Sequence, residues 1–139
     1  MRGIFVDTGA WFALKCKTDP YHQKVREFFR QMERGTVCFT SDYVADEAIT
    51  LVRLRLRNHR VAAQLAEELF GEKAARLIYV SPAHHRRALE IFKRYADQDF
   101  SYTDCTSFAI MEALGLREAL AFDVHFTFEK FGFYQVAME

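Results

Sequence analysis

Four acidic residues lie beside apolar runs, where a folded chain gains least from a charge. Asp7 and Asp123 each follow directly on a short apolar run. Glu47 interrupts the apolar stripe of one expected helix, and Asp104 opens another apolar helical segment. A buried carboxylate without a partner is so costly that it neutralises, pairs or binds a cation. A shared divalent cation is the simplest common explanation for the four.

Carboxylate oxygens are the ligands that hard cations such as Mg²⁺ and Mn²⁺ prefer. Two carboxylates a few Å apart repel by roughly 4 kcal/mol at intermediate dielectric, and a bound cation removes that penalty. A cation that keeps water in its shell can also activate that water against phosphorus. The acids therefore predict a site that is anionic when empty and able to act on phosphate esters when loaded.

Short apolar runs alternate with longer helical patterns, which predicts an α/β fold. We expect three layers, α/β/α, around a central, mostly parallel sheet of four to five strands. Strands are expected at 3–6, 36–40, 77–80, 119–122 and 133–136. Helices are expected at 8–14, 20–34, 42–57, 60–70, 82–95 and 103–114. No linker or low-complexity stretch divides the 139 residues, so residues 1–139 are expected to form a single domain.

This arrangement should bring the acids together. Ligands of open parallel sheets lie beyond the carboxyl ends of the strands. Asp7 and Asp123 are expected at two such strand ends. Glu47 lies early in the helix that follows the second strand, and Asp104 lies in the first turn of another helix. The four side chains are therefore predicted to surround one pocket.

Each acid also has a purely structural interpretation. Asp7 could cap the helix that follows it, and Asp123 could be an ordinary turn residue. Asp104 matches a capping box that begins at Ser101. Glu47 could pair with a nearby arginine, although a helix has no capping use for an acid at that position. Taken together, these interpretations require four coincidences in the right order.

The charge balance limits the kind of nucleic-acid binding that is possible. Lys+Arg and Asp+Glu both number 19, so the formal net charge is zero and the global basic excess of a non-specific nucleic-acid binder is absent. Arg53 and Arg57 are four residues apart and are expected on one helical face, where they could hold phosphates. A solvated helix face or a surface for an acidic partner is the alternative.

The cysteines and the hydropathy point to a reduced, cytoplasmic protein. Cys16, Cys38 and Cys105 are odd in number and far apart, so buried, reduced side chains are expected, with zinc or thiol chemistry as the alternative. No apolar run approaches the length of a membrane span, and the N-terminus lacks the apolar core of a signal peptide.

The acidic residues also carry a resemblance to a known family. They lie in the segments Phe5-Val6-Asp7-Thr8, Asp46-Glu47-Ala48, Tyr102-Thr103-Asp104-Cys105 and Ala121-Phe122-Asp123. In order and spacing these segments resemble PIN-domain nucleases, particularly the VapC-type toxins of bacterial toxin–antitoxin pairs. The resemblance implies a Mg²⁺- or Mn²⁺-dependent ribonuclease for single-stranded RNA, with a cognate antitoxin and a homodimeric state. It assigns the acidic roles to the four carboxylates and an assisting hydroxyl to Thr8.

Other functions and other candidate residues fit less well. A receiver-like phosphotransfer domain needs an acceptor Asp after a middle strand, where Ser81 stands, and a haloacid-dehalogenase phosphatase needs an Asp where Gly9 stands. A non-catalytic PIN-like module that binds RNA or protein remains the main alternative.

Three further features have less certain roles. His125 could touch substrate, and His85 is expected to be exposed. The aromatic stretch 126–134 could close the core, form a dimer surface or receive an antitoxin helix.

Overall fold

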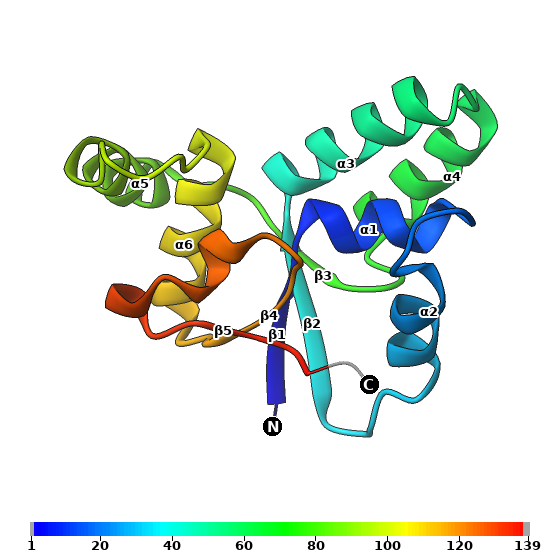
Figure 1. Ribbon diagram of the computed structural model, residues 1–139, viewed down its shortest axis with the longest axis horizontal. Helices are drawn as coiled ribbons and strands as arrows, with labels where there is room; N and C mark the ends of the chain where they lie inside the picture. The colour runs from blue at the N-terminus through cyan, green and yellow to red at the C-terminus, as the bar shows by residue number, and fades with distance from the viewer. Residues whose placement is uncertain (1, 138–139) are drawn as a thin grey trace.

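A five-stranded parallel sheet forms the centre of the molecule in the computed structural model, which describes residues 2–137. The strands are β1 (Arg2–Val6), β2 (Thr36–Ser41), β3 (Arg76–Ile78), β4 (Glu118–Leu120) and β5 (Tyr134–Gln135). Their order in the sheet is β3-β2-β1-β4-β5, and every neighbouring pair is parallel (Figure 1). The predicted α/β class with a parallel central sheet is confirmed.

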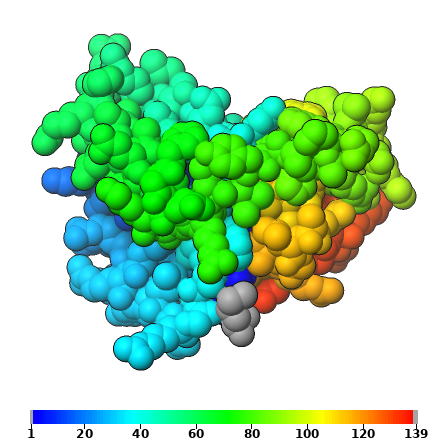
Figure 2. Space-filling model, turned by 180° about the vertical axis from the view of Figure 1, so that it is seen from behind, coloured from blue at the N-terminus to red at the C-terminus, as the bar shows by residue number. Residues whose placement is uncertain are grey.

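Helices cover both faces of this sheet. They are α1 (Thr8–Lys15), α2 (His22–Arg30), α3 (Asp42–Arg55), α4 (His59–Phe70), α5 (Pro82–Arg94) and α6 (Tyr102–Leu114), followed by the 3₁₀ turns η1 (Val124–Thr127) and η2 (Glu129–Phe131). In Figure 1, α1 to α4 lie on one side of the sheet and α5 and α6 on the other. From behind, the green stretch that contains α4, β3 and the start of α5 crosses the molecule from side to side (Figure 2).

The central strand β1 is buried because helices lie against both faces of the sheet. Ile4, Phe5 and Val6 are fully inaccessible, as a continuous apolar run in a parallel sheet predicts. Thr40 is the polar exception beside them. Its hydroxyl donates to the Val6 carbonyl at 3.0 Å and accepts from Trp11 Nε1 at 3.1 Å. The first helix is thus fixed to the carboxyl ends of β1 and β2, where the acids were expected.

The aromatic stretch 126–134 closes the core, as one of the three interpretations of the sequence predicted. Phe126 and Phe133 are buried against Phe108 of α6, with ring centroids 5.1 and 5.8 Å away. Phe131 lies 5.0 Å from the same ring. Most of this aromatic surface is therefore used inside the chain, although Tyr134 is half exposed.

Two predicted helix ends are wrong. The second helix ends at Arg30 rather than 34, so Met32 lies beyond it and is exposed, and Gly35 adopts a left-handed φ of +86° in the turn before β2. The third helix ends at Arg55 rather than 57. Asn58 caps α4 by accepting a bond from the Val61 N–H at 3.2 Å, which requires the chain to leave the α3 helix first.

Strands β3 and β4 also end two residues earlier than predicted, at Ile78 and Leu120. Asp123 is therefore reached through a short connection after β4 and not at the last strand residue. The predicted caps are confirmed at Ser41, at Ser81 with Pro82 in the first helical turn, and at Gly115 in the left-handed region after α6.

All three cysteines are buried and free, as predicted. Burial raises the pKa of the Cys38 and Cys105 thiols to about 11, which keeps both protonated. Within residues 2–137, no helix is long and apolar enough to cross a membrane.

Candidate active site

Asp7 is a buried carboxylate at the carboxyl end of the central strand. It is 8% exposed and occupies the N-cap position of α1, where its main-chain oxygen accepts bonds from Ala10 and Trp11. The side chain, however, makes no capping hydrogen bond. The interpretation of Asp7 as a helix cap is therefore wrong for the carboxylate, which is left available for another partner.

The pKa of the Asp7 carboxyl reflects both its burial and the charges of other acids. Burial raises the pKa of its carboxyl from 3.8 to about 7, and the adjacent Thr8 N–H lowers it in part. The charges of Asp104, Glu47 and Asp123 raise it further. Three segments remote in sequence thus contribute charge at one point beyond the sheet. Ligand atoms of Asp104, Asp123 and His125 lie within 4.8 Å of one another, whereas the meeting of all four acids in one pocket stays a prediction.

Asp104 combines a structural role with a free oxygen. Its Oδ2 accepts the Ser101 N–H at 3.0 Å, while Ser101 Oγ accepts the Asp104 N–H at 3.0 Å, so the predicted capping box is formed. The cap uses Oδ2, and Oδ1 has no hydrogen bond within residues 2–137. The capping interpretation is correct, but it does not exclude a second role because it uses one oxygen only.

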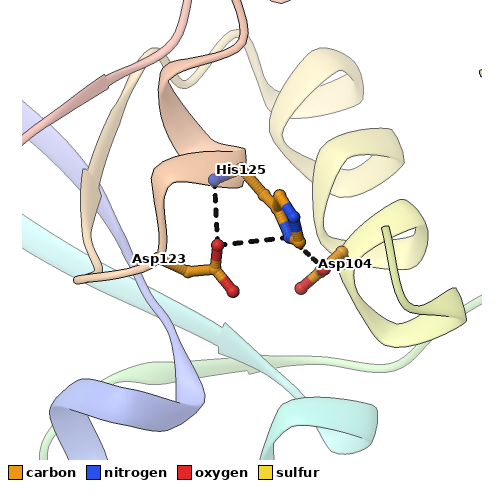
Figure 3. A group of neighbouring side chains, drawn as sticks. All are labelled: Asp104, Asp123 and His125. Atoms are coloured by element: carbon orange, nitrogen blue, oxygen red, sulfur yellow. Dashed lines mark hydrogen bonds and ion pairs between the residues drawn. The ribbon is translucent and has the colours of Figure 1, made fainter. Parts of the chain in front are cut away.

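Asp123 is likewise a turn residue that meets the site. Its Oδ1 accepts the backbone N–H of His125 at 2.9 Å, which begins η1. The His125 ring then bridges the two acids, with Nδ1 3.2 Å from Asp123 Oδ1 and 3.0 Å from Asp104 Oδ2 (Figure 3). Sequence reasoning considered His125 only as a substrate contact, because nothing in the sequence places it beside Asp104.

Glu47 is exposed, which corrects the prediction that it interrupts a buried stripe. The buried face of α3 consists of Val44, Ala45, Ala48 and Val52. Glu47 precedes Ala48 by one residue and so lies about 100° around the helix from it. None of the ion pairs within residues 2–137 involves Glu47, so pairing with a nearby arginine is not observed. It nevertheless remains close enough to raise the pKa of Asp7.

Two buried hydroxyls adjoin the acids. Thr8 Oγ1 and Ser107 Oγ are buried and have no hydrogen-bond partner within residues 2–137. Thr8 follows Asp7 directly, and Ser107 follows Asp104 by three residues, which puts it on the same face of α6. A buried hydroxyl usually has a partner. Unpaired hydroxyls beside several carboxylates fit a site that binds a cation and its water.

The donor set also fits a divalent cation. Ligand atoms of Asp104, Asp123 and His125 lie within 4.8 Å of one another. With Asp7 and Glu47, the site offers mainly carboxylate oxygens, which suit Mg²⁺ and Mn²⁺. The N-terminal ends of α1, α3 and α6 lie at the same edge, and their dipoles favour negative charge there (Figure 1). They offset part of the repulsion among the acids and would also favour a phosphate.

The predicted pair of phosphate-binding arginines is not on one helical face. Arg53 lies in the last turn of α3, but Arg57 follows the helix with a left-handed φ of +50°. Both are exposed. Between them, the Arg55 guanidinium lies 5.7 Å from the centre of the Phe12 ring. Contact of Arg53 and Arg57 with RNA stays a prediction that no longer rests on shared helical spacing.

A groove adjoins the exposed side of the site. It has a volume of about 410 Å³, and its lining includes Glu47 and Thr103, the residue before Asp104. Tyr43 lines it too, with its hydroxyl 3.3 Å from His85 Nε2. His85 Nδ1 is 2.8 Å from the Tyr102 hydroxyl, so the expected exposed charge is in fact the centre of a three-helix hydrogen-bond network.

Comparison with known proteins agrees with this geometry. The sequence model of one family, described as PIN domain, matches residues 4–133. The 23S rRNA-specific endonuclease VapC20 of Mycobacterium tuberculosis is 32% identical over 124 residues, which cover 89% of this chain and 92% of that protein. The VapC ribonuclease of Archaeoglobus fulgidus is 28% identical over 131 residues, which cover 91% of this chain and 81% of that protein.

Two solved structures share the fold. The crystal structure of Mycobacterium tuberculosis VapC20, described as a Sarcin-Ricin loop cleaving toxin, aligns with a TM-score of 0.85 at 32% identity. The alignment covers 96% of this chain and 98% of that one. FitAcB from Neisseria gonorrhoeae aligns over 96% of each chain with a TM-score of 0.69 at 15% identity, a likeness of fold alone.

Proposed function

The chain belongs to the PIN-domain family, and from this membership and the geometry of the site we propose that it is a metal-dependent endoribonuclease. Its substrate is single-stranded RNA, and the reaction is hydrolysis of a phosphodiester bond, carried out by one nuclease domain of residues 1–139. The observation that carries the proposal is the grouping of ligand atoms of Asp104, Asp123 and His125 within 4.8 Å at the edge of the sheet where the buried Asp7 carboxylate makes no capping hydrogen bond. The free-energy cost of burying an ionised carboxylate is smallest when the carboxylate binds a cation.

Asp7, Glu47, Asp104 and Asp123 are the residues that we assign to the cation, either directly or through bound water. The cation, Mg²⁺ or Mn²⁺, would supply charge stabilisation at the phosphate and a water of lowered pKa. Glu47 is exposed and unpaired within residues 2–137, so its carboxylate can orient the attacking water and accept its proton. Asp7 and Asp104 are held by β1 and α6 and supply the fixed part of the site.

The substrate contacts belong to the same proposal. Thr8 Oγ1 is buried beside Asp7 without a protein partner within residues 2–137, so it can donate to a phosphate oxygen or a bound water. Arg53 and Arg57 are exposed and can contact RNA phosphates further from the cleaved bond. The dipoles of the helix N-termini at this edge favour the same anion.

We also propose that the protein is the toxin of a toxin–antitoxin pair and that it forms a homodimer. The crystal structure of VapC20, which is described as a toxin and is 32% identical to this chain, supports the first statement. Apolar side chains that stay exposed support a protein partner, among them Leu54 on α3 and Leu89 and Phe92 on α5. Light scattering of the purified chain tests the dimer, and co-purification from the native host tests for a small DNA-binding antitoxin.

A cleavage assay tests the nuclease itself. Purified wild-type protein should cut single-stranded RNA with Mg²⁺ or Mn²⁺ and lose this activity in EDTA. Asp7→Asn and Asp104→Asn should abolish cleavage with an unchanged circular dichroism spectrum. Asp97→Asn is the matched control, because Asp97 is an exposed acid outside the site, and it should cut normally.

Retained activity in the purified Asp7→Asn or Asp104→Asn variant would refute the site assignment. RNA binding without cleavage by the wild-type protein, at every divalent cation tried, would favour a non-catalytic PIN-like module instead.

A further inference from the structure

We propose that His125 is a positioning residue that sets which oxygen of Asp104 and of Asp123 faces the cation. This inference rests on the proposed metal-dependent function. It assigns to His125 a role that is neither a metal ligand nor a substrate contact. The His125 ring joins two acids that come from α6 and from the connection after β4 (Figure 3).

The hydrogen bonds divide each carboxylate into a held and a free oxygen. Asp104 Oδ2 accepts two hydrogen bonds, one from the Ser101 N–H and one from His125 Nδ1, each at 3.0 Å. Asp123 Oδ1 accepts the His125 backbone N–H at 2.9 Å and lies 3.2 Å from His125 Nδ1. Oδ1 of Asp104 and Oδ2 of Asp123 have no such bond within residues 2–137. Each acid therefore keeps one oxygen for a ligand.

The neighbours of the ring fix its tautomer. Both atoms that face Nδ1 are carboxylate oxygens, which only accept, so Nδ1 carries the hydrogen and donates it to Asp104 Oδ2, with Asp123 Oδ1 3.2 Å away. The nitrogen that faces the acids is thus occupied as a donor and is not a free lone pair. This geometry is that of an outer residue that orients ligands.

The ring itself is held in place by packing. Phe100 meets it edge-on, with centroids 5.2 Å apart and planes at 84°. The next residue, Phe126, is fully buried against Phe108. The Asp123 main-chain oxygen accepts the Gln135 amide at 2.9 Å and so ties this turn to β5. His125 is anchored on both sides of the turn and can act as a fixed support.

Removal of the ring should weaken cation binding without removal of a ligand. Asp104 would keep its Ser101 bond and Asp123 its backbone bond, but the link between the two carboxylates would be lost. Outer partners of this kind change metal affinity by about 10- to 100-fold. His125→Leu should therefore raise the Mn²⁺ dissociation constant by about that factor. His125→Asn should restore most of the affinity, because its amide can donate from near the position of Nδ1.

Mn²⁺ titration followed by electron paramagnetic resonance and by calorimetry tests this inference on the full chain. Circular dichroism and thermal unfolding establish that each variant is folded. Affinity lost in His125→Leu and recovered in His125→Asn supports the positioning role. Unchanged Mn²⁺ affinity in folded His125→Leu overturns it, as does failure of His125→Asn to restore the affinity.

Pulsed resonance gives a readout that separates positioning from ligation. A directly coordinated imidazole couples its nitrogen to the Mn²⁺ spin, and we expect no such coupling from His125 in the wild-type protein. A ligand-strength nitrogen coupling that disappears in His125→Leu would overturn the inference while it leaves the nuclease proposal intact. Failure of the wild-type protein to bind any Mn²⁺ would instead overturn the proposed function itself.

Discussion

At the scale of single residues, the site consists of two kinds of carboxylate. Some also make local hydrogen bonds, and one is buried where its charge is unfavourable. Asp104 and Asp123 each use one carboxylate oxygen in a local hydrogen bond, Asp104 in a helix cap and Asp123 in a turn. The Asp7 carboxylate makes no capping hydrogen bond, although Asp7 is the most buried of the four acids. Local structure therefore accounts for two of the acids in part, and Asp7 is the one whose position requires a ligand.

Asp7 should make the stability of the metal-free protein depend on pH. Its folded pKa of about 7 lies above the ordinary 3.8, so the folded state binds the proton more tightly than the unfolded state does. Its contribution is fully present below about pH 4 and is lost as the pH rises through 7. The loss is on the order of 4 kcal/mol, since one pKa unit corresponds to about 1.4 kcal/mol.

Urea unfolding in EDTA at pH 5 and pH 8 measures this effect. Asp7→Asn carries no charge, so its stability relative to wild type should increase from the lower to the higher pH. Mg²⁺ should stabilise the wild-type protein at pH 8 and leave the variant nearly unchanged. Parallel pH profiles for the two proteins would show that Asp7 does not carry this electrostatic cost.

Glu47 should show the opposite balance of stability and function. It is exposed and forms no ion pair within residues 2–137, so Glu47→Gln should change the free energy of unfolding by no more than about 0.5 kcal/mol. Cleavage should nevertheless be lost, because the variant lacks the carboxylate that we assign to the cation and the attacking water. Glu67→Gln is the same change on the exposed face of α4 and should cut RNA like the wild type. Equal activity in the two variants would remove Glu47 from the site.

At the scale of elements, the sequence predicted where helices begin better than where they end. Ser41, Ser81 and Ser101 all cap the helices that were expected after them, because a cap depends on residues within one turn. The helix after Pro20 ends four residues early, and α3 ends before Arg57, because these ends depend on the following element and on where the buried face stops. The bridge through His125 is set by tertiary packing, which no local pattern encodes.

The cap of α6 should matter for the site as well as for stability. Ser101→Ala removes the oxygen that accepts the Asp104 N–H and should cost about 1 kcal/mol. Because the same turn orients Asp104, Mn²⁺ binding should weaken too. Asn58→Ala removes the cap of α4 and should cost a similar amount while it leaves the cation affinity unchanged. Thermal unfolding and calorimetry on both variants make the comparison, and equal affinities would show that the α6 cap is only structural.

At the scale of the whole molecule, segments that are far apart in the sequence lie at one edge of the sheet. Asp7 follows β1 there, acids on α3, on α6 and in the connection after β4 raise its pKa, and the first turns of three helices face the same edge (Figure 1). The alternation of apolar runs and helical patterns predicted this topology, and a general rule for parallel sheets placed the ligand. The order of the strands and the exact approach of the side chains required the structure.

The zero net charge of the chain should give RNA binding a shallow salt dependence. Without a global basic surface, only local contacts release counterions, at a slope of about −0.7 per phosphate for single strands. If Arg53 and Arg57 contact phosphates, the slope of log K against log salt is about −1.4, and Arg53→Gln reduces it to about −0.7. Arg57→Asn should do the same, since Asn tolerates the left-handed backbone at that position.

Fluorescence anisotropy with a short RNA, in EDTA and in the non-cleaving Asp7→Asn background, measures these slopes without a contribution from the cation. Arg30→Gln is the control, because Arg30 is an exposed arginine at the end of α2 that pairs with Glu27. It should leave the slope unchanged. A slope that Arg53→Gln does not alter would show that Arg53 does not contact the RNA phosphates, and the same outcome for Arg57→Asn would exclude Arg57.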